Sequence, residues 1–91
     1  MTHTEMLLIR LSILLDRDIS FQDIYDNLGS QAYILAWERS EYMVNAGLLR
    51  RFSRTGINRY EPTEKGLAVY RSQCEITGEP KFTLLVQKVL L

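Results

Sequence analysis

Apolar residues recur at helical spacing in four long stretches of the chain, and turn-forming residues separate these stretches. The pattern predicts helices over about residues 4–15, 21–27, 31–45 and 64–77. A side chain that can cap a helix precedes each one, and these side chains belong to Thr2, Ser20, Ser30 and Thr63. The first helix is apolar around much of its circumference, so we expect it to lie at the centre of the core or to be shared with a partner.

The stretch between the third and fourth helices has the pattern of a β-hairpin. Gly47 suits the residue that ends a helix, and Thr55–Asn58 supplies turn chemistry between two strand-like runs. Residues 19–21 can add a short extended segment. We therefore predict an α+β fold, mostly α, with a sheet of two or three strands.

The end of the chain contains a further apolar segment, which is predicted to be a helix that begins near Pro80. Its apolar side chains repeat at helical spacing: Phe82, Leu85, Val86 and Val89. This helix either folds back onto the core or packs against its equivalent in a second chain. We favour a homodimer, because so small a domain leaves the helix no obvious partner. Residues 1–78 are then the folded domain, and residues 79–91 are the dimerisation element.

The helix predicted over residues 31–45 has two contrasting sides. One side is a stripe of residues suited to burial, which comprises Tyr33, Ala36, Ser40, Met43 and Val44. The opposite side comprises Gln31, Ile34, Glu38 and Glu41. We expect Trp37 to pack against the first helix or the hairpin, although its exposure with Ile34 would instead suit a protein-docking surface.

Charge is unevenly distributed, although the formal net charge is zero. Residues 1–47 hold three basic and seven acidic side chains, a net of −4, whereas residues 48–91 hold eight basic and four acidic ones, a net of +4. Only the second half could approach phosphate. Its hairpin contains four arginines, Arg50, Arg51, Arg54 and Arg59. They indicate contact with DNA, or else charges that keep an exposed strand edge from pairing.

Catalysis and metal binding are not expected. The chain has one histidine, His3, and one cysteine, Cys74, so it lacks a metal site of usual ligand spacing, and no set of nucleophile, base and acid is visible. We interpret Cys74 as a small buried residue rather than a redox sensor, and we expect no cofactor. A lone cysteine favours a reducing, cytoplasmic location, and no membrane-spanning segment is predicted.

The order of the predicted elements resembles the winged helix-turn-helix superfamily, in particular MarR- and PadR-like bacterial regulators. Gly29 lies at the turn between the second and third helices, and residues 47–48 are similar to the family's junction between helix and wing. Residues 50–59 occupy the wing, and Tyr60–Gly66 is similar to the family's wing exit. The resemblance implies a DNA-binding transcription regulator, in which the third helix enters the major groove and the wing anchors phosphates.

The partner implied by the resemblance is double-stranded DNA, bound by a non-enzymatic protein. The residues at matching positions are Ser30, Gln31, Tyr33, Arg50, Arg51, Arg54, Asn58 and Arg59. The chain departs from the family in its third helix, where Arg39 is the single basic side chain among acidic and apolar residues. The alternative is a winged helix that binds another regulatory protein through this helix and does not bind DNA.

Overall fold

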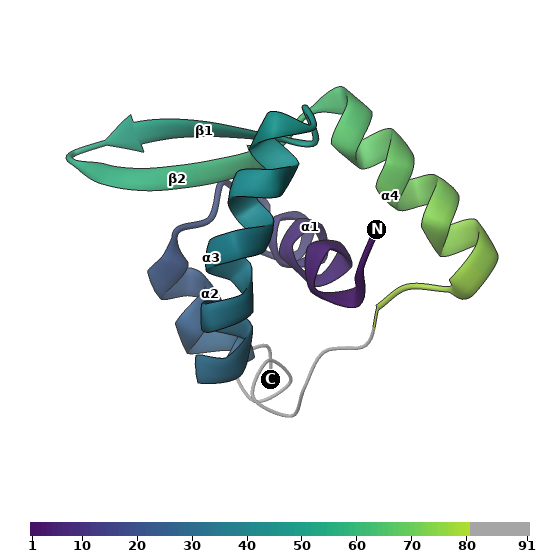
Figure 1. Ribbon diagram of the computed structural model, residues 1–91, viewed down its shortest axis with the longest axis horizontal. Helices are drawn as coiled ribbons and strands as arrows, with labels where there is room; N and C mark the ends of the chain where they lie inside the picture. The colour runs from purple at the N-terminus through teal and green to yellow at the C-terminus, as the bar shows by residue number, and fades with distance from the viewer. Residues whose placement is uncertain (81–91) are drawn as a thin grey trace.

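A computed structural model describes residues 1–80 of the chain (Figure 1). Its elements are α1 (His3–Leu15), α2 (Phe21–Leu28), α3 (Ser30–Asn45), β1 (Leu49–Arg54), β2 (Ile57–Pro62) and α4 (Glu64–Thr77). The fold is α+β and mostly helical, as predicted, and the ends of the four predicted helices agree to within one residue. The predicted dimer contacts of Phe82, Leu85, Val86 and Val89 lie outside the described residues.

Local capping fixes where three of these helices begin. The Thr2 hydroxyl accepts a hydrogen bond from the Glu5 N–H over 3.2 Å, and the Glu5 carboxylate accepts one from the Thr2 N–H over 2.7 Å. Ser20 and Asp23 repeat this capping box at the start of α2. Thr63 accepts a hydrogen bond from the third residue of α4. These three predicted caps are confirmed.

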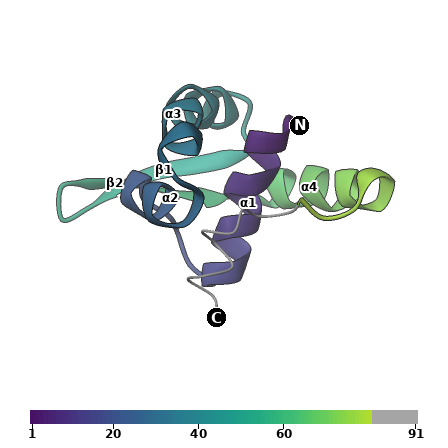
Figure 2. The ribbon, with the colours of Figure 1, turned by 90° about the horizontal axis from the view of Figure 1, so that it is seen from below.

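α1 lies at the centre of the molecule, between the hairpin and α4 (Figure 2). Its apolar residues fill the core and are almost inaccessible to water: Met6, Leu7, Leu8, Ile9 and Leu11. Residues from every other helix and both strands pack around them. The prediction of a central first helix is therefore confirmed, and burial of these aliphatic side chains is the main source of the fold's stability.

β1 and β2 form a two-stranded antiparallel sheet. The turn between them consists of Thr55 and Gly56, which both have positive φ, at 52° and 77°. Asn58, which was expected in the turn, belongs to β2. Ile19 exchanges two backbone hydrogen bonds with Tyr60, each 2.8 Å long, so the connector between α1 and α2 extends the sheet by one bridge. We call β1, β2 and their turn the hairpin.

Candidate interaction site

α3 packs one side against the core and leaves the other in solvent. Gly29 is its N-cap and Ser30 is its first residue, so the prediction that the Ser30 side chain caps this helix is wrong. Three residues of the predicted inner stripe are buried: Ala36, Ser40 and Met43. The other two, Tyr33 and Val44, are half-buried. The prediction of which side faces inward is therefore confirmed.

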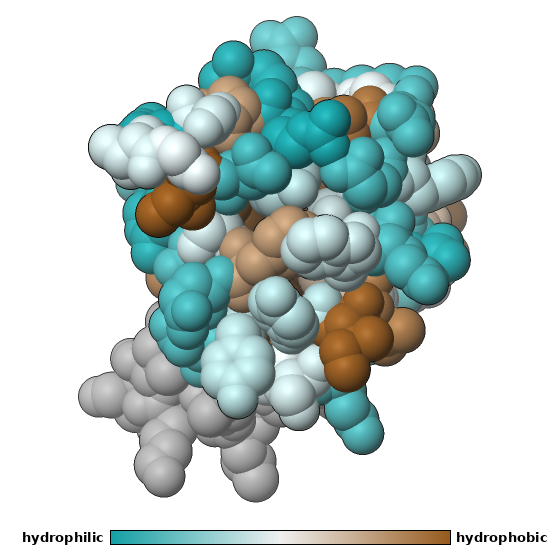
Figure 3. Space-filling view, turned by 60° about the vertical axis from the view of Figure 1, so that its left-hand side comes forward, coloured by the Kyte–Doolittle hydropathy of each residue, from teal (hydrophilic) through white to brown (hydrophobic). Residues whose placement is uncertain are grey.

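The outer side of α3 exposes large apolar side chains. Ile34 is 67% exposed and Trp37 is 60% exposed, so the prediction that Trp37 packs against the first helix or the hairpin is wrong. With Glu38 and Glu41 these residues follow the spacing i, i+3, i+4 and i+7, which places all four on one side of the helix. The α2–α3 face is defined by Tyr25, Tyr33, Ile34, Trp37, Glu38 and Glu41. Figure 3 views the molecule with the left-hand side of Figure 1, where the hairpin and α2 lie, turned toward the reader. On this side, residues of low polarity (pale to brown) lie among hydrophilic ones (teal).

A chain of aromatic contacts holds this face in place. Trp37 stacks on Phe21 with ring centroids 5.0 Å apart and planes inclined by 26°. Phe21 in turn meets Tyr33 and Tyr60 edge to face, over 5.9 and 5.3 Å. Tyr25, which is 50% exposed, meets Tyr33 edge to face over 5.9 Å. Because Tyr60 is buried in the core, the exposed rings are anchored to a rigid part of the fold.

The strand register divides the hairpin side chains between two faces. Arg51 lies opposite Tyr60, and Ser53 lies opposite Asn58. Side chains alternate along a strand, so these four share one face, and Tyr60 directs that face toward α2 and α3. We call it the inner face. The outer face comprises Arg50, Phe52, Arg54, Ile57, Arg59 and Glu61.

Arg51 is the one hairpin arginine on the inner face. Its guanidinium donates a hydrogen bond to the Glu41 carboxylate of α3, and this bond raises the pKa of Arg51 above its ordinary value. Both side chains remain about half exposed. The arginine that lies nearest to α3 is thus already paired with a carboxylate.

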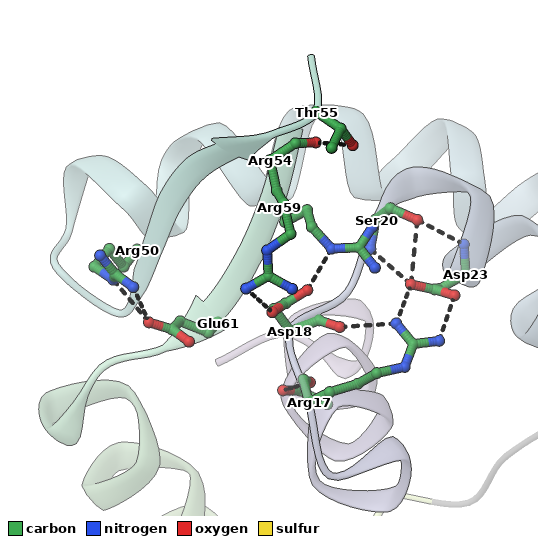
Figure 4. Close-up of polar contacts among 10 residues, drawn as sticks. Arg17, Asp18, Ser20, Asp23, Arg50, Arg54, Thr55, Arg59 and Glu61 are labelled. Atoms are coloured by element: carbon green, nitrogen blue, oxygen red, sulfur yellow. Dashed lines mark hydrogen bonds and ion pairs between the residues drawn. The ribbon is translucent and has the colours of Figure 1, made fainter. Parts of the chain in front are cut away.

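The other three hairpin arginines lie on the outer face, and each has a carboxylate partner (Figure 4). Arg50 donates to Glu61 across the strands. Arg54 and Arg59 both contact Asp18, whose side chain is only 10% exposed. The hydrogen bond from Arg59, helped by the charge of Arg54, holds the pKa of Asp18 below its ordinary value.

The connector between α1 and α2 positions Asp18 for these contacts. Arg17 donates two hydrogen bonds of 2.9 Å to the two oxygens of Asp23, and Asp23 also accepts hydrogen bonds from Ser20 (Figure 4). Burial raises the pKa of Asp23, but the hydrogen bonds from Arg17 and Ser20 outweigh it, so the pKa lies below its ordinary value. These bonds and the bridge from Ile19 to β2 fix the connector beside the outer face.

The residues expected to contact DNA do not converge on one surface. Ser30 and Gln31 are exposed in the first turn of α3, at the end of the helix farther from the hairpin (Figure 1). Tyr33 is half-buried in the aromatic contacts, and Asn58 is exposed on the inner face. Of the four predicted arginines, the structure brings only Arg51 beside α3.

The carboxylates of Asp18 and Glu41 pair with hairpin arginines, and the sequence did not identify them as members of this site. They come from the acidic half of the chain, and Asp18 is 41 residues from its partner Arg59. Strand alternation, counted from the two-residue turn, could have separated Arg51 from the other arginines. No local signal could have shown which carboxylates pack against them.

Cys74 is half-buried beside Tyr70, and burial raises the pKa of Tyr70 to about 12. Within the described part of the chain, no cluster of three or more possible ligands could hold a metal ion. No helix in that part is both long and apolar enough to cross a membrane.

Comparison with known proteins gives no match: no family model, no curated protein and no solved structure is significantly similar to this chain.

Proposed function

We propose that this chain is a winged-helix domain that binds another protein through the α2–α3 face. The winged-helix assignment is supported by the element order, by the turn at Gly29 and by the Ile19 bridge, which adds a third extended segment to the hairpin. The observation that supports protein binding is the exposure of Ile34 and Trp37 in the middle of α3. A helix that reads DNA would present polar or basic side chains there.

The aromatic residues of this face have the properties of interface hot spots. Trp37 is large, and its stack on Phe21 fixes its ring before any partner arrives. A side chain that is already ordered loses little rotamer freedom on binding, so more of its contact energy appears as affinity. Trp and Tyr are also the residues most often found at such hot spots.

The charges of the face indicate the chemistry of the partner. Glu38 lies four residues beyond Ile34, and Glu41 lies four residues beyond Trp37, so each carboxylate neighbours one of the exposed apolar side chains. Glu41 is paired with Arg51, whereas Glu38 forms no ion pair within residues 1–80. A partner segment with apolar side chains and a lysine or arginine would therefore fit, since its cation could lie on the indole ring next to a carboxylate.

A DNA-binding regulator, acting as a homodimer, is the second candidate. The observation that favours it is the exposure of Arg50 and Arg54, whose side chains stay 61% and 62% exposed despite their carboxylate partners. Exposed ion pairs are weak, so phosphate could displace the carboxylates. In this case the hairpin would anchor the DNA backbone, with little reading of bases by α3.

Trp37 provides the test, because it is the only tryptophan in the chain and lies at the centre of the proposed interface. The probes are an amphipathic helical peptide of leucine and arginine, a matched peptide of leucine and glutamate, and a random-sequence DNA duplex. We expect the leucine–arginine peptide to shift Trp37 emission to shorter wavelength and the other two probes to have no effect. Ile34→Gln should weaken peptide binding, whereas Ile76→Gln, at an exposed apolar residue of α4, should not.

Two results would count against the proposal. The first is failure of both peptides to bind. The second is binding of duplex DNA whose log affinity falls with log salt at a slope of about −3 or steeper, and less steeply in Arg54→Ala, since this slope counts phosphate contacts. That second result would establish the DNA-binding candidate instead.

A further inference from the structure

The outer face of the hairpin is chemically complementary to the α2–α3 face. The Arg50 guanidinium lies 4.7 Å from the centre of the Phe52 ring, and that of Arg54 lies 5.5 Å from it. These three side chains therefore form a row in which one aromatic ring separates two cations. Ile57 is 52% exposed and extends the row at the tip.

The balance of charge differs in sign between the two faces. The outer face has three arginines, and its carboxylate partners are Glu61 and Asp18, which leaves an excess of one positive charge. The α2–α3 face has Glu38 and Glu41, with Arg51 as the partner of the second, which leaves an excess of one negative charge.

The two faces cannot meet within one molecule. Alternation along the strands points Arg50, Phe52 and Arg54 to the opposite side of the sheet from Arg51 and Tyr60. Tyr60 contacts the aromatic cluster of α2 and α3, so the outer face points away from that cluster. Their complementarity can be used only between two copies of the chain.

We propose that the chain associates head to tail, with the outer face of the hairpin of one copy docked on the α2–α3 face of the next. The inference rests on the proposed function, because it names a second copy as a protein that this face binds. A guanidinium of the row, Arg50 or Arg54, stacks on the free side of Trp37 and pairs with Glu38. Ile57 covers Ile34, which removes both exposed side chains from water.

Charge argues against a symmetric alternative on the same surface. A two-fold interface between two α2–α3 faces would bring Glu38 and Glu41 of one copy close to the same residues of its partner, and like charges at an interface are unfavourable. The head-to-tail arrangement places opposite charges together. Such an interface leaves one hairpin and one α2–α3 face free at the two ends, so association continues beyond the dimer.

The test uses the full chain and two variants in sedimentation velocity, from about 1 µM to about 1 mM, the range over which weak interfaces dissociate. Glu38→Arg alters only the α2–α3 face, and the double variant Arg50→Ser with Arg54→Ser alters only the outer face. We expect the unaltered chain to show species larger than a dimer that shrink on adding salt. Each variant alone should remain a monomer.

A mixture of the two variants gives the decisive result. Each supplies one intact face and one altered face, so the mixture should form a one-to-one dimer and nothing larger. A monomer in all samples would overturn the head-to-tail inference, while peptide binding at Trp37 would still support the proposed function. A dimer that persists in the double variant would also overturn it, because that interface would not use the outer face. All three proteins should have the same circular dichroism, since the changed side chains are exposed.

Discussion

The two faces of the hairpin use arginine in different ways. On the inner face, Arg51 meets Glu41, and both side chains stay about half exposed. On the outer face, Arg54 and Arg59 converge on Asp18, which is almost withdrawn from solvent, and Arg59 itself is only 20% exposed. The comparison shows that the number of arginines in a hairpin does not determine the electrostatic potential of its surface. The carboxylates that packing brings beside them decide how much positive charge remains.

The two sets of contacts also attach the hairpin to different parts of the fold. Arg51 joins it to α3 through one exposed ion pair, which contributes little to stability. Asp18 joins it to the connector between α1 and α2, next to the backbone bonds between Ile19 and Tyr60. We therefore expect the Asp18 contacts of the outer face to contribute more to stability than the Arg51–Glu41 pair of the inner face. Three predictions test how the hairpin is attached to the fold, in order of decreasing effect.

The largest effect is expected at the root of the hairpin, which is the end where β1 begins after Leu48 and which both faces share. Gly66 of α4 lies against the backbone of Leu48, and a Cβ at this position would overlap the Leu48 carbonyl oxygen. The overlap cannot be relieved without moving β1, so Gly66→Ala should destabilise the protein by about 3 kcal/mol or more, measured by chemical denaturation. Gly56→Ala at the tip is the control, because its Cβ meets open space and only the positive φ costs about 1 to 2 kcal/mol. Equal losses in the two variants would show that the root is not tightly packed.

The second prediction weakens the outer face alone. Because Arg59 and Arg54 lower the pKa of Asp18 in the folded state, the ionised carboxylate stabilises the fold. This contribution is complete above the ordinary aspartate pKa of about 3.9 and is lost as the pH falls through the lower folded value. Asp18→Asn should therefore lower the melting temperature at neutral pH, and the difference from the unaltered protein should shrink below about pH 4.

The matched control for Asp18 is Asp26→Asn. Asp26 accepts a hydrogen bond from Gln22 and forms no ion pair within residues 1–80, so its removal should change the melting temperature little at any pH. If Asp18→Asn lowered the melting temperature equally at neutral and acid pH, the charge of Asp18 would not be what holds the outer face. Packing of the connector would then be the cause.

Local chemistry explains why the helices could be predicted from the sequence. A capping box such as Ser20 with Asp23 is made by residues three positions apart, so the sequence alone shows it. α3 is an instructive exception at its start: Ser30 could serve as a cap by type, but the tight turn at Gly29 makes it the first helical residue. The two candidate positions differ by one residue, and the backbone conformation at Gly29 decides between them.

The candidate site could be predicted only in part, because it depends on contacts between distant segments. The sequence shows that Trp37 lies at the margin of the buried stripe. It does not show that Phe21 covers one side of the ring, and this contact decides which side stays in solvent. In the same way, the excess of acid before residue 48 and of base after it gave no sign that Asp18 and Glu41 would be placed against arginines. Tertiary packing, rather than composition, sets the charge of each surface.

The smallest effect on stability, and the most informative for function, is expected on the inner face. Glu41→Gln removes the partner of Arg51 while leaving a side chain of the same size, so the melting temperature should hardly change. Arg51 would then be free beside α3, and binding to a random DNA duplex should become more salt-dependent, with the log–log slope steeper by about 1 than in the unaltered chain.

Glu38→Gln is the control, because it removes the same charge from the same helix without releasing an arginine. An equal slope in both variants would mean that Glu41 does not keep Arg51 from phosphate, and that the inner face is neutral toward DNA for another reason.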